Sequence, residues 1–111
     1  MVRITAFIKP HRLEPVKSAI AAVGVTGMSV GDVRGTGNSS EDSHFLRGQG
    51  VLALPIRARI EVVALDDQAE EILQAIRDSS YTGEHEDGKV FVERVEEAVR
   101  IRTNERGESA I

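Results

Sequence analysis

The sequence predicts a small α+β fold in which two helices cover one face of a four-stranded sheet. Three observations predict it: stretches of alternating polarity, stretches with apolar residues at helical spacing, and the order of these stretches along the chain. A strand, a helix and a strand are followed by a long loop and then by another strand, helix and strand. This βαββαβ order, made of two βαβ units of similar length, is typical of a ferredoxin-like sandwich.

The first unit occupies the N-terminal third of the chain. Alternation of apolar and polar residues over 2–8 predicts a strand. Apolar residues at helical spacing over 13–23 predict a helix, which Gly24 closes. Residues 27–34 then predict a second strand, weakened by its glycines.

The second unit follows a long irregular stretch. Residues 35–55 are rich in glycine and serine and predict one long loop, and so long a loop in a small domain is more often functional than idle. Residues 57–65 alternate like a strand, Asp66-Asp67 is expected to cap the next helix, and residues 69–79 carry an amphipathic helical pattern. The last strand or strand pair is predicted over 89–102.

The apolar pattern of the predicted strands calls for a partner. Two helices cover only one face of a four-stranded sheet, yet apolar side chains alternate onto both faces. Phe7, Val33, Val63 and Leu65 are expected on the face opposite Ile4, Ile60 and Val62. The simplest cover for the second face is another copy of the chain.

Composition excludes several function classes. A chain of 111 residues is expected to form one domain. A net charge of −4 and only three phenylalanines and one tyrosine argue against a general nucleic-acid interface. Without cysteine there is no disulfide framework and no thiolate chemistry, and no apolar run is long enough to span a bilayer. The start of the chain does not read as a signal peptide, so we expect a cytoplasmic protein.

One segment concentrates positive charge. The turn signal Asp87-Gly88 delivers Lys89 to the mouth of a strand, beside backbone N–H groups. Arg100 and Arg102 are two residues apart, so they would share one face of an extended strand. A lysine, two guanidiniums and turn amides together suit a phosphate. The alternative is a plain hairpin turn followed by solvated arginines.

Other chemistries find less support. His11, His44 and His85 share no metal-ligand spacing, so we expect no metal site. Residues 35–37 lack the third glycine of a dinucleotide loop, and Lys89 is not followed by the hydroxyl of a Walker loop. A small nucleotide-hydrolysing enzyme remains an alternative, although no water-positioning base or metal set is evident. We therefore expect no catalytic residue.

Short motifs spread along the chain carry a resemblance to a known family. They are Ile8-Lys9-Pro10, the run Gly24 to Val30, Gly35-Thr36-Gly37, Leu46-Arg47-Gly48, the run Arg59 to Val63, Thr82-Gly83, the run Asp87 to Val92, Arg100-Ile101-Arg102-Thr103 and Ser109-Ala110-Ile111. In order and spacing the chain resembles the PII signal-transduction family over nearly its whole length.

The resemblance implies one PII-like domain over residues 1–111 that assembles as a homotrimer and binds AMP, ADP or ATP as effectors between neighbouring subunits. Residues 35–57 would be the T-loop, which docks on a target protein, 82–89 the B-loop, and 103–111 a mobile C-terminal arm. Gly27, Met28, Ser29, Glu61 and Val63 would surround adenine and ribose. The phosphates would be held by Gly35, Thr36, Gly37, Gly88 and Lys89, and by Arg100 and Arg102 of the neighbouring subunit.

Departures from the family pattern point to fewer phosphates. Asn38 and Ser39 replace an arginine and a glutamine that serve the phosphates and the joint binding of ATP, magnesium and 2-oxoglutarate. Glu86 replaces a glycine, and Glu84 adds a second carboxylate. We therefore expect AMP or ADP to bind at least as well as ATP, with little or no response to 2-oxoglutarate.

The same departures make the chain look more like divergent members of the family that are associated with transport or inorganic carbon. Some of those members respond to bicarbonate. Arg47 and Arg57 are the candidate residues for that anion. A conventional nitrogen-regulatory PII protein that senses 2-oxoglutarate is the alternative.

Overall fold

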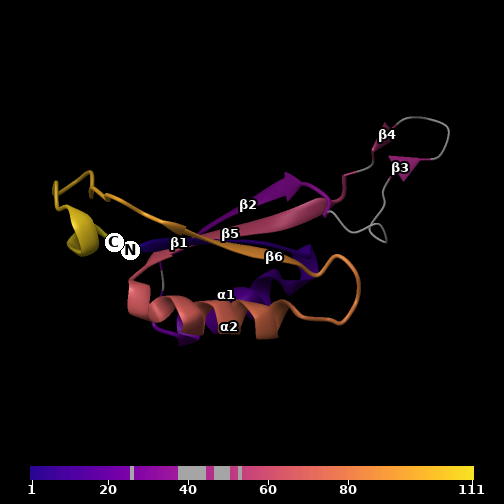
Figure 1. Cartoon of the computed structure of the whole chain (residues 1–111), viewed down its shortest axis with the longest axis horizontal. Coiled ribbons are helices and arrows are strands. Elements are labelled where there is room, and N and C mark those ends of the chain that lie inside the picture. The colour runs from indigo at the N-terminus through magenta and orange to yellow at the C-terminus, as the bar shows by residue number, and fades with distance from the viewer. Residues whose placement is uncertain (26, 38–44, 47–50, 53) are drawn as a thin grey trace.

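A computed structural model describes residues 1–25, 27–37, 45–46, 51–52 and 54–111. In this part of the chain an antiparallel sheet with strand order β2-β5-β1-β6 is covered on one face by helices α1 and α2 (Figure 1). The strands are β1 (Val2–Ile8), β2 (Ser29–Arg34), β5 (Ile56–Ala64) and β6 (Gly88–Arg94), and the helices are α1 (Leu13–Ala22) and α2 (Ala69–Ser80). The predicted α+β, ferredoxin-like class is confirmed.

The core lies between the helices and one face of the sheet. Strand β1 is central and pairs with β5 and β6, so that Ile4 lies opposite Val62 on one side and Val92 on the other. Because side chains alternate along a strand, every second residue of β1 and β5 is buried against the helices. The largest fully buried side chains are Ile4, Ile8, Ile20, Ile60, Ile72, Ile76 and Val16.

The other face of the sheet has no second layer in the described part of the chain (Figure 1). It mixes apolar and charged groups: Phe7 and Phe91 make an edge-to-face contact with ring centroids 6.1 Å apart, and Arg59 lies 3.8 Å from Glu61. The predicted apolar residues Phe7, Val33 and Val63 are half-buried there.

Two local predictions differ from the structure in the middle of the chain. Within the predicted loop, β3 (Phe45–Leu46) and β4 (Val51–Leu52) form a short antiparallel pair, and residues 38–44, 47–50 and 53 lie outside the described residues. Asp66 does not cap α2. It begins a 3-10 turn (Asp66–Gln68), and its carboxylate instead contacts the Met1 amino group at 2.9 Å and the guanidinium of Arg94 at 3.1 Å.

The last predicted strand ends earlier in the structure than residue 102. Strand β6 ends at Arg94, and beyond it Val99 and Arg106 form an isolated bridge. The expected mobile arm carries a short 3-10 helix, Gly107–Ala110. This segment lies at the opposite end of the molecule from β3 and β4 (Figure 1). None of the described helices is long and apolar enough to cross a membrane.

Candidate functional site

A cleft of about 480 Å³ opens where the end of β2, the start of β5 and the turn before β6 meet. A backbone hydrogen bond holds the cleft at one side, where the Gly35 N–H donates to the Pro55 carbonyl at 3.0 Å. This bond keeps the segment just after β2 next to the segment just before β5. The lining residues are Phe7, Val33, Arg34, Gly35, Thr36, Gly37, Arg57, Glu86, Asp87, Gly88, Lys89 and Phe91.

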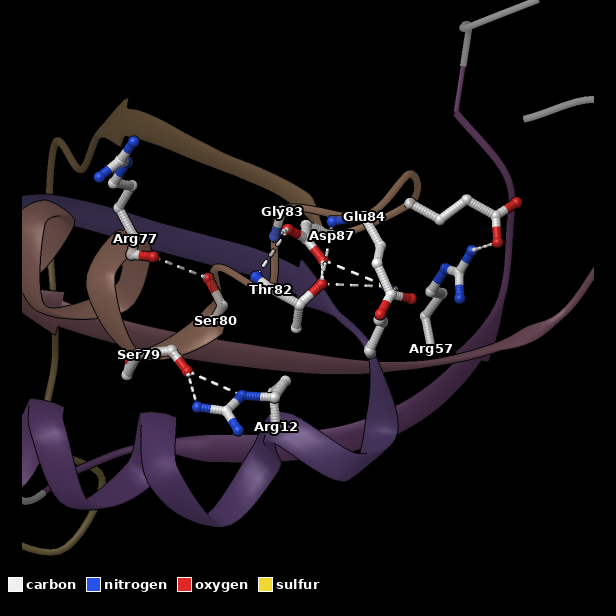
Figure 2. A network of polar contacts seen from close by, with 11 residues as sticks. Arg12, Arg57, Arg77, Ser79, Ser80, Thr82, Gly83, Glu84 and Asp87 are labelled. Atoms are coloured by element: carbon white, nitrogen blue, oxygen red, sulfur yellow. Dashed lines mark hydrogen bonds and ion pairs between the residues drawn. The ribbon is translucent and has the colours of Figure 1, made fainter. Parts of the chain in front are cut away.

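The turn before β6 is built around the carboxylate of Asp87. Its oxygens accept hydrogen bonds from the Thr82 N–H at 2.8 Å, the Gly83 N–H at 3.0 Å and the Thr82 hydroxyl (Figure 2). The ammonium of Lys9, at the end of β1, lies 3.2 Å from Asp87 and 3.5 Å from Glu84. Asp87 therefore holds the start of the turn against its end, and through Lys9 it holds the turn against the end of the central strand β1.

The helices fix where this turn starts. The guanidinium of Arg12, just before α1, donates to the Ser79 carbonyl near the end of α2 at 3.0 and 2.7 Å (Figure 2). Because the turn begins within a few residues of that carbonyl, the contact places it beside the end of β1.

These contacts lower the pKa of the Asp87 carboxyl group. Burial raises the pKa of Asp87, but hydrogen bonds from the Thr82 hydroxyl and N–H, the Lys9 ammonium and the Gly83 N–H outweigh it and lower the pKa to about 2. The carboxylate form is thus favoured by folding. This contribution to stability is fully present above the unfolded pKa of 3.8 and is lost as the pH falls through about 2.

We therefore expect an acid-sensitive term in the free energy of unfolding, on the order of 1 kcal/mol because the turn is partly solvated. Urea unfolding at pH 7, 4 and 2.5 measures it. The parent should lose more stability than Asp87→Asn between pH 4 and 2.5, since the variant has no carboxyl to protonate. Equal losses in the two proteins would contradict the assignment to Asp87.

Gly88 brings the turn against β1. Its φ is +115°, and a Cβ at this position would lie 1.9 Å from the Phe7 carbonyl oxygen. This close approach aligns Lys89 with Phe7 in the β1–β6 register. Lys89 lines the cleft, and within the described residues no carboxylate lies in ion-pair range of its ammonium.

Arg57 provides a second cation in the cleft, and it is already paired. Its guanidinium lies 3.1 Å from the Glu86 carboxylate, with only 11% and 21% of the two side chains exposed. Glu86 itself has φ +70°, in the left-handed region that L residues rarely adopt.

Comparison with known proteins identifies the family. A family model described as "Nitrogen regulatory protein P-II" matches residues 1–105. The chain is 43% identical over 113 aligned positions to the nitrogen regulatory protein P-II of Cereibacter sphaeroides, with all of both chains covered. The chain belongs to the P-II family.

Other relatives agree with this assignment. The P-II chain is 36% identical to the nitrogen regulatory protein GlnK of Escherichia coli strain K12, over the full length of both. The crystal structure of Arabidopsis thaliana PII bound to citrate matches 99% of this chain and 91% of its own, with a TM-score of 0.81 and 35% identity. The resemblance stated from the motifs is thereby confirmed.

The cleft brings together part of the residue set that the P-II resemblance implies. Five of the phosphate candidates line it, as does Arg57. The adenine and ribose candidates do not line it: Ser29 lies opposite Glu61 in the β2–β5 register, and Met28 packs partly against the core. The five that line it are Gly35, Thr36, Gly37, Gly88 and Lys89. Gly27 and Val63 are also outside it, and Asn38, Ser39 and Arg47 lie outside the described residues.

The prediction that Arg100 and Arg102 lie on an extended strand is wrong. The chain turns back at residues 101–104, where the Asn104 N–H donates to the Arg100 carbonyl at 2.7 Å and Asn104 has φ +61°. The Arg100 side chain lies 3.5 Å from the Glu105 carboxylate. The Val95 N–H donates to the Met1 carbonyl at 3.1 Å, so the segment that follows continues past the start of β1, at the end of the sheet away from the cleft in the same chain.

Sequence reasoning missed the structural roles of two residues. In the sequence Lys9 is part of the Ile8-Lys9-Pro10 motif and Asp87 is part of a turn signal, whereas in the structure the two side chains pair and hold the turn. The signal that was available is a threonine followed five residues later by an aspartate, a spacing that lets the carboxylate accept from the threonine N–H and hydroxyl.

No group of three or more acidic or histidine side chains suited to a metal occurs among the described residues.

Proposed function

We propose that this P-II protein is a regulator that binds adenine nucleotides in the Lys89 cleft. The observation that carries the proposal is the cleft itself: an ammonium without a carboxylate partner in the described chain faces the glycine-rich backbone of residues 35–37. A lysine beside exposed backbone suits a phosphate. Binding would control a target protein through residues 35–57, in the cytoplasm.

The proposal includes a homotrimer. Arg100 and Arg102 lie at the far end of their own subunit, so they can hold phosphates only in the cleft of a neighbour. The uncovered face of the sheet, with Phe7 and Phe91, also favours association with further copies.

The charges of the cleft support a preference for few phosphates. Beside the cleft Lys9 is engaged by Asp87 and Glu84, and within it Arg57 is engaged by Glu86. Lys89 and Arg34 are the remaining cations of the described lining, and Arg34 contacts the Leu54 carbonyl at 3.4 Å. With Lys9 and Arg57 occupied by carboxylates, the chain offers fewer cations to a phosphate tail, which favours one or two phosphates over three. AMP or ADP should therefore bind at least as well as ATP.

Calorimetry and thermal shifts with AMP, ADP, ATP, 2-oxoglutarate and bicarbonate test the proposal. A ligand at about one hundred times its dissociation constant adds ~2.7 kcal/mol to native stability, which a thermal shift detects readily. We expect AMP and ADP to stabilise the protein, ATP to bind no more tightly than ADP, and 2-oxoglutarate to leave ATP binding unchanged. Absence of a shift with any adenine nucleotide would contradict nucleotide binding.

Conventional nitrogen regulation is the second candidate function. It is favoured by the names of the relatives, which are nitrogen regulatory proteins. The two candidates differ in one result, because a conventional regulator binds ATP more tightly when 2-oxoglutarate is present. The inorganic-carbon extension has less support from the cleft, because its candidate Arg57 is paired with Glu86.

A further inference from the structure

Glu86, which forms the ion pair with Arg57, has an unfavourable backbone conformation. A non-glycine residue with φ +70° is strained by roughly 1–2 kcal/mol relative to glycine. Glycine adopts this left-handed conformation freely, so the turn itself does not require a glutamate. What the glutamate adds is a carboxylate that lies 3.1 Å from the Arg57 guanidinium inside the cleft.

We propose that Glu86 is a specificity-determining residue, whose carboxylate competes with an incoming phosphate for the Arg57 guanidinium. This inference rests on the proposed nucleotide binding and names the residue that limits the number of phosphates. The competition is direct, because carboxylate and phosphate oxygens use the same guanidinium N–H donors. A ligand that engages Arg57 must first displace Glu86.

Burial makes this pair different from the other charges of the turn. The Glu84 side chain is 80% exposed, so water and salt screen its effect on a ligand. The Arg57 and Glu86 side chains are mostly buried, and a charge-assisted contact there is screened much less. On this proposal a short ligand such as AMP binds at Lys89 without engaging Arg57, whereas a ligand with further phosphates engages Arg57 only by displacing Glu86.

Glu86→Gln tests the inference, with Glu84→Gln as the matched control. Both variants remove one negative charge from the same turn, but only Glu86→Gln frees Arg57. Calorimetric titration with AMP, ADP, ATP and inorganic pyrophosphate gives four affinities for each protein. We expect Glu86→Gln to bind ATP and pyrophosphate about tenfold more tightly than the parent, and to bind AMP with an affinity that differs by less than about threefold. In Glu84→Gln all four affinities should differ from those of the parent by less than about threefold.

A double-mutant cycle separates competition from a general effect of charge. In an Arg57→Ala background the gain from Glu86→Gln should vanish, because no guanidinium remains to be freed. A gain that persists without Arg57, or one that Glu84→Gln reproduces, would overturn the inference. If Glu86→Gln does not fold, Glu86→Gly removes the carboxylate and the backbone strain together and carries the same expectation.

Failure of the inference is distinguishable from failure of the proposed function. AMP binding with no gain in ATP or pyrophosphate affinity in Glu86→Gln overturns the role of Glu86 and leaves nucleotide binding intact. If no adenine nucleotide binds the parent, nucleotide binding falls. The role of Glu86 is then decided by pyrophosphate alone, and equal pyrophosphate affinities of parent and variant overturn it.

Discussion

Alanine at position 88 is expected to lower the free energy of unfolding by more than about 4 kcal/mol, enough to prevent stable folding. A Cβ on Gly88 would lie 1.9 Å from the Phe7 carbonyl oxygen and 2.9 Å from the Phe7 carbonyl carbon, and both are backbone atoms of the central strand. No rotamer change relieves a clash with backbone. The φ of +115° adds strain for any L side chain.

Thermal unfolding of Gly88→Ala measures this effect. A loss of that size corresponds to a melting temperature lower by more than about 15 °C in a domain of this length. Gly35→Ala is the matched control, since a Cβ there meets nothing within 4 Å and its φ is not left-handed. A Gly88→Ala protein that melts within a few degrees of this control would show that β1 and β6 do not approach as closely as described.

Lys89→Ala is expected to weaken ADP binding by about 10- to 100-fold. The estimate follows from the 1.5–3 kcal/mol that a hydrogen bond to a charged group typically contributes, at about 1.4 kcal/mol per tenfold change in affinity. Lys89 lines the cleft, and the register with Phe7 directs its side chain onto the uncovered face of the sheet. Lys9 and Arg57 are engaged by carboxylates and are not free to replace it.

Calorimetric titration with ADP measures this loss, and Lys17→Ala is the control. Lys17 lies on α1, outside the cleft, and pairs with Glu14 at 3.1 Å. Its replacement removes the same charge from the protein without touching the cleft. Equal ADP affinities of Lys89→Ala and Lys17→Ala would mean that any nucleotide binds elsewhere.

The fold could be predicted from the sequence because its information is local and periodic. Alternation over residues 2–8 and 57–65 gave two central strands that the structure bounds as Val2–Ile8 and Ile56–Ala64. Helical spacing placed α1 and α2 to within about one residue, since burial against one sheet face demands that spacing. Asp87-Gly88 likewise marked the turn that delivers Lys89 to β6.

The site could be predicted only in part, because its remaining contacts join residues far apart in the sequence. Nothing local indicates that Lys9 meets Asp87 or that Arg57 meets Glu86. The arginine pair failed for a different reason. A spacing of two fits an extended strand, but Asn104 adopts a left-handed conformation and reverses the chain just after Arg102.

Calorimetric titration of the parent protein with ADP, repeated with ATP in the presence and absence of 2-oxoglutarate, tests the central claim most directly. We expect saturable ADP binding, an ATP affinity no higher than that of ADP, and no gain in ATP affinity from 2-oxoglutarate. No binding of ADP or ATP at millimolar concentration would contradict the assignment of the Lys89 cleft as a nucleotide site.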